Sequence, residues 1–204
     1  MVRVRNHVNP MHWPLRPMPQ TRLHFQHGCE VELGCADARF LFERAANNPG
    51  TPHVGVEIRF PLVDQVNHLA RAQGLSNLSA HFANLTVDLD TLFADGSIER
   101  AFINFPDPWF KRRHQKRRLV TEELIEILHR KISRGGELFF QSDVFDLALD
   151  AMAILESSGS FQNALGPWSF LRANPYGARS TREVRCEDRN LRIWRMLYRR
   201  PDLP

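Results

Sequence analysis

Short apolar runs alternate along the chain with longer stretches in which apolar residues recur every three or four positions. The short runs predict buried strands, and the longer stretches predict helices that turn one apolar face toward a sheet. The strands are expected at residues 29–33, 53–58, 78–82, 100–105 and 137–141, with 161–165 and 191–198 as final candidates. The helices are expected at residues 37–47, 62–74, 119–133 and 145–157.

The alternation of strands and helices that begins at Gly28 predicts an α/β domain. Repeated β-α-β units form a parallel sheet covered by helices on both faces. The run at 100–105 is almost wholly apolar, as a central parallel strand should be. Residues 1–27 differ, because they contain four prolines, four arginines, no acidic residue and no periodic pattern. We therefore expect an extended basic arm at residues 1–27 and a single domain with a doubly wound, mostly parallel sheet at residues 28–204.

The overall composition is that of a globular protein, with 43% hydrophobic and 25% charged residues in 204. No apolar stretch approaches the roughly 20 residues that span a bilayer, and no apolar segment follows Met1 as in a secretory signal. Three cysteines are too few for a disulfide framework, and the histidines and cysteines between residues 24 and 35 match no zinc pattern. We therefore expect a cytoplasmic protein with reduced thiols and with no membrane or metal partner.

Positive charge is concentrated in tracts. Residues 111–118 hold six Lys and Arg and no acidic residue, and removing those six would turn the net charge of +4 into −2. A second basic region at residues 172–200 holds nine arginines against three acidic residues. Such tracts are typical of a surface for a polyanion, although each alone is equally consistent with a solvated face. The density at 111–118 favours a nucleic acid.

Ligands of open α/β sheets bind beyond the carboxyl ends of the strands, so the residues at those ends are the candidates for a site. The first strand ends at Glu32-Leu33-Gly34, where the turn has one glycine instead of the three of a dinucleotide fingerprint. Such a turn suits a cofactor without a pyrophosphate, or an ordinary strand–helix connection. Glu57 is placed to accept the hydroxyls of a ribose, and Asn84 to contact an adenine edge.

The segment that follows the fourth strand, residues 104–118, is the most informative feature of the sequence. Two prolines flank Asp107 and hold it at the rim of the sheet. Trp109 offers a stacking face, and the basic tract starts at Lys111. A carboxylate, an aromatic plane and phosphate-binding charge within about fifteen residues suit a reaction on a nucleobase.

This segment resembles the signature of the tRNA (guanine-N7)-methyltransferases. The residues that carry the resemblance are Asn104-Phe105-Pro106-Asp107-Pro108-Trp109-Phe110-Lys111-Arg112-Arg113-His114 and Lys116-Arg117-Arg118. Less specific matches are Glu32-Leu33-Gly34, Gly55-Val56-Glu57, Ser142-Asp143, the segment from Ser180 to Glu183 and Ile193-Trp194-Arg195. The resemblance covers roughly residues 28–198 and is strongest to the cyanobacterial and plastid-type branch, because of Gly34-Cys35-Ala36 and Asn84.

The resemblance implies a Rossmann-like class I methyltransferase with a seven-stranded sheet, S-adenosylmethionine as cofactor and tRNA as partner. The methylated atom would be N7 of the variable-loop guanine, at position 46 in standard tRNA numbering. The implied cofactor-binding residues are Glu32, Glu57, Asn84 and Asp107, with Gly34 in the first loop, and Asp107 is also the implied catalytic residue. The implied substrate-binding residues are Lys111, Asp143, Ser180, Thr181, Arg182 and Glu183. The implied RNA contacts are Arg113, His114, Gln115, Lys116, Arg117 and Arg118.

Guanine N7 carries a free lone pair, so methyl transfer to it needs no base to remove a proton first. The enzyme must align N7, the methyl carbon and the sulfur. A carboxylate such as Asp107 or Asp143 can accept hydrogen bonds from the guanine N1–H and amino group and stabilise the growing positive charge. We therefore expect Asp107 to act by positioning and electrostatics.

Some positions depart from the family pattern. Ala36 and Ala38 replace glycines common in the first loop, Asn84 replaces a frequent aspartate, and Arg182 stands where an aromatic residue is usual. These departures leave open an RNA-binding protein that has the fold without the activity. Another alternative is a methyltransferase that acts on a different nucleic acid or on protein, whereas a dehydrogenase is disfavoured by the glycine-poor loop. The sequence does not decide between a monomer and a homodimer.

Overall fold

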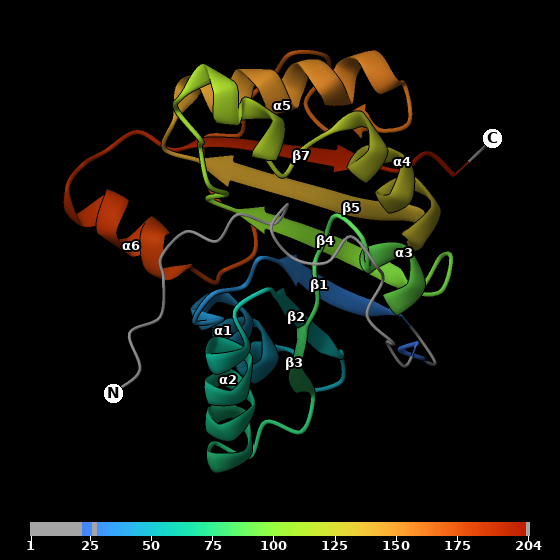
Figure 1. The fold of residues 1–204 in the computed structure, drawn as a ribbon, viewed down its shortest axis with the longest axis vertical. Coiled ribbons are helices and arrows are strands. Elements are labelled where there is room, and N and C mark those ends of the chain that lie inside the picture. The colour runs from blue at the N-terminus through green and yellow to red at the C-terminus, as the bar shows by residue number, and fades with distance from the viewer. Residues whose placement is uncertain (1–21, 26–27, 203–204) are drawn as a thin grey trace.

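Seven strands form one sheet in the order β3-β2-β1-β4-β5-β7-β6 (Figure 1). The computed structural model describes residues 22–25 and 28–202. The strands are β1 (Cys29–Leu33), β2 (His53–Glu57), β3 (Leu78–Phe82), β4 (Ile98–Asn104), β5 (Ile132–Ser142), β6 (Gln162–Asn163) and β7 (Trp194–Arg199). Strands β1 to β5 pair in parallel, and β7 is antiparallel to both β5 and β6. The predicted Rossmann-like fold with a doubly wound, mostly parallel seven-stranded sheet is confirmed.

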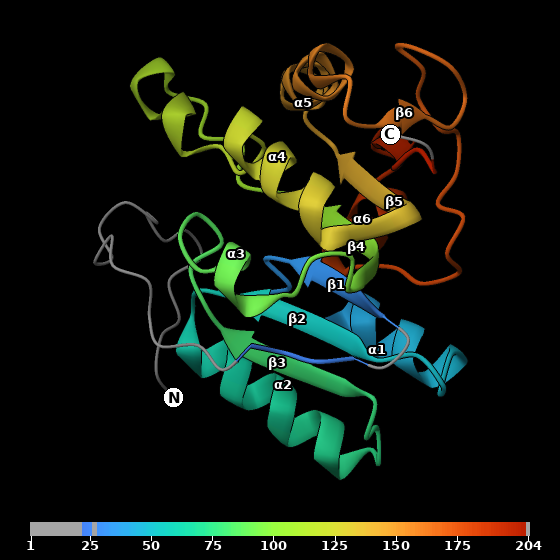
Figure 2. The same cartoon turned by 90° about the vertical axis from the view of Figure 1, so that its right-hand side faces the viewer.

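Helices cover both faces of the sheet, as Figure 2 shows for α3 and α4 on one side and α1 on the other. The helices are α1 (Arg39–Asn47), α2 (Phe60–Ala72), α3 (Leu89–Leu92), α4 (Glu122–Lys131), α5 (Phe145–Ser158) and α6 (Thr181–Asp188), with a 3₁₀ helix η2 (Arg112–Arg117). One core lies under α3, α4 and α5, and a second lies under α1 and α2. Along β4, Phe102 enters the second core while Ala101 and Ile103 enter the first, which is why the centre of this strand is apolar on both faces.

Strand β5 is longer than predicted. It begins at Ile132, so Gly135-Gly136 lies within the strand and is not the turn before it. Gly135 has a φ of +72°, and a Cβ on Gly136 would lie 2.8 Å from the carbonyl oxygen of Glu99. The two glycines therefore form an irregularity in the strand, where neighbouring backbone approaches closely. For the same reason α4 ends at Lys131, before the predicted limit of residue 133.

Three helical segments were not predicted: α3, η2 and α6. Helix α6 has a mostly polar sequence, and only Glu183 and Cys186 are buried, so it lacks the apolar stripe that identifies a helix in a sequence. The predicted N-terminal arm lies mostly outside the described residues. Within residues 22–25, the N–H of Leu23 donates to the carbonyl of Leu92 at 2.9 Å, and Leu23 packs on the core. No helix in the described part of the chain is long and apolar enough to cross a membrane.

Candidate active site

The predicted cofactor and substrate positions meet at one edge of the sheet. Glu32 and Glu57 lie at the carboxyl ends of β1 and β2, and Asp107 follows β4 directly. Helix α6, which begins inside the predicted substrate segment, stands beyond the edge to which β4 and β5 point in Figure 1. The carboxyl edge, defined as the strand ends from β1 to β5 with the loops that follow them, is therefore the candidate site.

Glu32 is buried at the end of β1 with one donor to its carboxylate. The amide of Asn104 donates to Oε1 at 2.7 Å, whereas the buried Oε2 finds no hydrogen-bond donor among the described residues. Burial, with the nearby carboxylates of Asp37 and Glu57, raises the pKa of Glu32 to about 8 in spite of the Asn104 bond. A buried carboxyl group with an unpaired oxygen and a raised pKa suits a ligand that brings a hydrogen-bond donor or a positive charge.

Glu57 has both carboxylate oxygens fully engaged within the protein. Oε1 accepts hydrogen bonds from the backbone N–H and the Nε of Arg59, at 3.0 and 2.8 Å. Oε2 accepts from the backbone N–H of Ala36 at 3.0 Å and from Nη2 of Arg59 at 2.8 Å. Two oxygens offer about four acceptor positions, so a ribose that binds Glu57 must displace the Arg59 guanidinium.

The loop after β1 follows a left-handed path. Gly34, Ala36 and Ala38 have φ values of +79°, +50° and +53°. Each alanine in this region costs about 1–2 kcal/mol relative to right-handed backbone. The two alanines that replace family glycines therefore keep a backbone that glycine adopts without strain. A Cβ on Gly55 would lie 2.6 Å from Sγ of Cys35, so the loop packs tightly on β2.

Asn84 shapes the loop that follows β3. Its side-chain Oδ1 accepts from the N–H of Thr86 at 3.1 Å, and its own N–H donates to the buried carboxylate of Asp88 at 2.8 Å. Such local bonds fix the path of a turn. Contact of Asn84 with an adenine stays a prediction.

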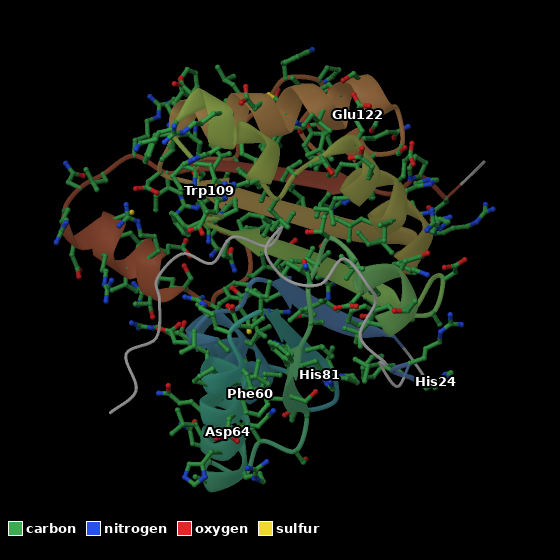
Figure 3. All side chains as sticks on the ribbon, viewed as in Figure 1. His24, Phe60, Asp64, His81, Trp109 and Glu122 are labelled. Carbon is green, nitrogen blue, oxygen red and sulfur yellow. The ribbon has the colours of Figure 1, made fainter. Side chains whose placement is uncertain are left out.

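The segment between β4 and η2 turns sharply at the carboxyl edge. Phe105 and Trp109 both have positive φ, +50° and +46°, and the N–H of Phe105 donates to the carbonyl of Gln141 at 2.8 Å. Strained backbone at non-glycine residues concentrates at functional sites. Asp107 lies between these two residues, and its negative charge, after the stronger influence of Glu57, helps to raise the pKa of Arg59. Figure 3 shows Trp109 at this edge.

The predicted RNA-contacting residues belong to η2 and its flanks, but they do not share one environment. Arg113 is exposed, as is Lys111, the predicted substrate-binding residue that precedes η2. The guanidinium carbon of Arg117 lies 5.1 Å from the ring centre of Trp109, and the ring of His114 meets the same tryptophan edge-on. Arg118 pairs with Asp150 and donates to the carbonyl of Pro108 at 3.1 Å. Arg117 and Arg118 therefore also hold the loop that carries Asp107.

The predicted substrate positions are linked by direct contacts. Arg182 forms an ion pair with Asp143 at the end of β5. Thr181 donates its hydroxyl to Asp37 in the first loop at 2.6 Å, which joins α6 to the β1–α1 connection. Ser180 caps the helix, because its hydroxyl oxygen accepts from the N–H of Glu183 at 3.2 Å.

Glu183 is fully buried and belongs to a hydrogen-bonded chain that crosses the sheet. Its carboxylate accepts from Gln141 and Arg195, each at 2.9 Å, and also from Asn174. Gln141 in turn donates to Oδ1 of Asn104 at 2.9 Å, and Asn104 donates to Glu32. The chain therefore connects a predicted substrate residue to a predicted cofactor residue through Gln141, which the sequence did not single out, and Asn104, which it named only as part of the family signature.

The charges at this edge favour a cationic ligand. The carboxyl groups of Glu32, Glu57, Asp37 and Asp107 gather there with the Arg59 guanidinium, and a bound cation would favour the charged form of Glu32, whose pKa is raised to about 8. A pyrophosphate would meet this cluster with unfavourable charge, whereas a sulfonium and an ammonium group would relieve it. S-adenosylmethionine fits this set of acceptors, which includes the unpaired, buried Oε2 of Glu32. Within residues 22–25 and 28–202, no group of three or more His, Cys, Asp or Glu could hold a metal ion, and the three cysteines are buried free thiols.

Comparison with known proteins agrees with this reading. A family model described as "Putative methyltransferase" matches residues 26–196. A tRNA (guanine-N(7)-)-methyltransferase of Synechococcus elongatus is 37% identical over 208 residues, which cover 97% of this chain and 96% of the relative. The chain belongs to the tRNA (guanine-N7)-methyltransferase family. A Synechocystis member is 35% identical, with 98% of both chains covered. The recognition made from residues 104–118 is confirmed.

Solved structures show the same fold at low sequence identity. A SAM-dependent methyltransferase from Aquifex aeolicus superposes with a TM-score of 0.58 at 10% identity, covering 92% of this chain and 85% of that one. A 30S ribosomal methyltransferase from an uncultured bacterium gives a TM-score of 0.57 at 12% identity, covering 85% of this chain and 87% of that one. These likenesses concern the fold alone.

Proposed function

We propose that this family member transfers the methyl group of S-adenosylmethionine to N7 of a guanine in tRNA, at position 46 in the variable loop. The proposal rests on one observation above all. An acidic, partly unpaired cluster suited to a cationic cofactor lies at the sheet edge where β4 ends, and the chain runs from there into a basic 3₁₀ helix, in a protein closely related to tRNA (guanine-N7)-methyltransferases. We further propose that the enzyme acts in the cytoplasm.

S-adenosylmethionine, when bound, supplies an electrophilic methyl group on a sulfonium. Glu57 would hold the ribose hydroxyls once Arg59 moves aside, and Glu32 would accept a donor on its unpaired Oε2. Gly34 exposes open space beside the loop, where no atom lies within 4 Å of a Cβ built on it. Asn84 would contact the adenine edge.

Asp107 would act on the guanine. The strained turn at Phe105 and Trp109 supports a fixed position for its carboxylate. The purine gains positive charge as the methyl arrives, so a fixed carboxylate stabilises the transition state more than the ground state. Asp143 and the segment that starts α6 would complete the guanine site, with Lys111 at its entrance. Exposed Arg113 and its basic neighbours would hold phosphates, which set register without reading sequence.

The alternative of an inactive RNA-binding protein is disfavoured by the first loop. Ala36 and Ala38 keep a left-handed backbone in spite of their side chains. The N–H of Ala36 still reaches Glu57. The loop therefore keeps the left-handed backbone and the contact with Glu57 that a cofactor-binding loop would need.

The function is tested by incubating the full chain with labelled S-adenosylmethionine and an unmodified tRNA transcript, followed by nucleoside mapping. We expect 7-methylguanosine at position 46. A transcript with 7-deazaguanine at that position is the matched control, because it lacks only the N7 atom, and it should take up no label there. Label on another base, or equal label on the 7-deaza transcript, would exclude methylation of this atom.

A further inference from the structure

A cavity of about 450 Å³ opens beside the start of β7. Its wall is formed by Phe170, Leu171 and Arg172 on one side and by Arg192, Trp194 and Arg195 on the other. The two sides are tied together, because the N–H of Leu171 donates to the carbonyl of Arg195 at 2.8 Å. The volume is in the range of small-ligand sites, and the wall is fixed by backbone pairing.

The cavity wall carries stacked planar groups. The guanidinium carbon of Arg192 lies 4.0 Å from the ring centre of Trp194. Phe145 and Phe170 pack on the same tryptophan, with ring centres at 4.3 and 5.0 Å. Phe145 is 42% exposed in spite of its size. This support holds Trp194 in place beneath the Arg192 guanidinium, and Arg192 itself is exposed.

Internal ion pairs neutralise only part of the positive charge of residues 172–200. Five of the nine arginines in residues 172–200 have partners: Arg179 with Glu187, Arg182 with Asp143, Arg195 with Glu183, Arg199 with Glu137, and Arg200 with the carbonyl of Ile132. The other four have no acidic partner among the described residues: Arg172, Arg185, Arg189 and Arg192. Two of these four line the cavity, and no acidic residue does.

The cavity adjoins the proposed guanine site. Trp194 pairs in register with Ser142, which directly precedes Asp143. Arg195, in the cavity wall, donates to Glu183 at the start of α6. A nucleic-acid strand whose guanine reached Asp143 would therefore bring an adjacent nucleotide to the cavity.

We propose that this cavity binds a nucleotide that flanks the target guanine, unstacked from its neighbours. Its base stacks on the outward face of the Arg192 guanidinium, and its phosphate pairs with Arg172. Bases in single-stranded RNA are bound in this way, on aromatic rings and on guanidinium planes. An acid-free wall with two unpaired arginines matches the charge of a nucleotide. The inference rests on the proposed function, since it takes tRNA as the substrate.

The test measures the affinity of the full chain for fluorescently labelled, unmodified tRNA transcripts. One transcript is intact. Each of the others carries a single abasic nucleotide, placed either directly before or directly after the target guanine. Arg192→Lys keeps the charge but loses the planar group. Arg185→Lys is the matched control, because Arg185 is also exposed and lacks an acidic partner among the described residues, but it lies outside the cavity wall.

For the wild type, one abasic position should weaken binding by about 5- to 150-fold, the usual contribution of a stacked base. Arg192→Lys should bind the intact and that abasic transcript equally, within about twofold, while Arg185→Lys keeps the wild-type difference. Insensitivity of the wild type at every flanking position, or an unchanged difference in Arg192→Lys, would overturn the cavity proposal. Absence of 7-methylguanosine with an intact binding difference would instead refute the proposed function alone.

Discussion

Two glutamates two residues apart on β1 lie in opposite environments. Glu30 is surrounded by basic side chains: Arg44 donates to it from two nitrogens, Arg100 donates at 2.9 Å, and His53 Nε2 lies 3.2 Å away. Burial alone would raise the pKa of Glu30, but the contacts with His53 and Arg44 outweigh it and lower the pKa to about 2. Glu32, one step closer to the carboxyl edge, has one donor and a pKa raised to about 8.

The difference separates stability from function along a single strand. At Glu30 the fold satisfies a buried carboxylate completely, and Arg44 also ties α1 to the carbonyl of Tyr176. At Glu32 the fold leaves an acceptor unpaired, which lowers stability unless something else occupies it. Proteins break the rule of satisfied polar groups mainly where a ligand completes the set. The comparison therefore predicts which changes affect folding and which affect binding.

The largest effect is expected from Glu30→Ala. It leaves the buried Arg44 guanidinium without its carboxylate, and breaking a buried pair costs about 3–5 kcal/mol. Urea unfolding should show this loss in the free energy of unfolding at pH 7. Because the folded pKa of Glu30 is lowered, its contribution is present above its ordinary pKa of 4.5 and lost as pH falls toward about 2. If Glu30→Ala were as stable as the wild type, Glu30 would not stabilise the fold, and the division of roles between Glu30 and Glu32 would be wrong.

Glu32→Gln should act in the opposite direction on stability. Because the pKa of Glu32 is raised, the folded protein holds a proton that the unfolded chain releases above pH 4.5. The free energy of unfolding of the wild type therefore falls as the pH rises from 4.5 to about 8. The slope is about 1.4 kcal/mol per pH unit. The variant, which has no titrating group there, should lack this part of the decline. Parallel stability curves for the two proteins from pH 5 to 8 would contradict the environment assigned to Glu32.

Glu57→Ala should weaken S-adenosylmethionine binding. A charged hydrogen-bonded contact contributes about 1.5–3 kcal/mol, or roughly ten- to hundredfold in affinity, and calorimetry measures it. Arg59→Ala is the matched control, because it frees the Glu57 oxygens that the guanidinium occupies. Affinity in that variant should equal or exceed that of the wild type. If affinity fell in Arg59→Ala and not in Glu57→Ala, the ribose contact would belong to Arg59 and not to Glu57.

The smallest effects are expected in the basic tract. Arg113→Ala removes an exposed charge and should lower the log–log salt slope of tRNA binding by about one unit, or less on a site without full duplex character. Arg118→Ala should add a loss of turnover, because Arg118 also binds Pro108 beside Asp107. Equal behaviour of the two variants would mean that Arg118 does not hold the loop.

The sequence predicted the main strands because central parallel strands are apolar on both faces, as in β4. It also located Glu32, Glu57 and Asp107 correctly at strand ends, because the order of elements alone brings those ends together. Their binding roles stay predictions. It missed α6, whose polar sequence carries no apolar stripe. Ser180 with Glu183 three positions later is a helix-capping pattern that could have been read.

The contacts of Arg59 and Gln141 could not be predicted from the sequence. Arg59 lies two positions after Glu57, and nothing local distinguishes a guanidinium that folds back from one that points to solvent. Gln141 is a buried polar residue that directly follows the apolar run 138–140, which was a usable signal, but its partners Asn104, Glu183 and Arg195 are 37 to 54 positions away. Such contacts depend on side-chain geometry that only the folded sheet sets.

The central claim is that the charges at the carboxyl edge perform the chemistry. Single-turnover methylation by Asp107→Asn, at saturating cofactor and tRNA, tests it most directly, because it isolates the chemical step from product release. Asp64→Asn, which removes an exposed carboxylate on α2 (Figure 3), is the control and should match the wild type.

A lost transition-state contact costs about 2.7–4 kcal/mol, so the rate of Asp107→Asn should fall roughly a hundred- to thousandfold. The free energy of unfolding should stay within about 0.5 kcal/mol of the wild type. A near wild-type rate in Asp107→Asn would contradict the account and leave Asp143 as the carboxylate that faces the guanine.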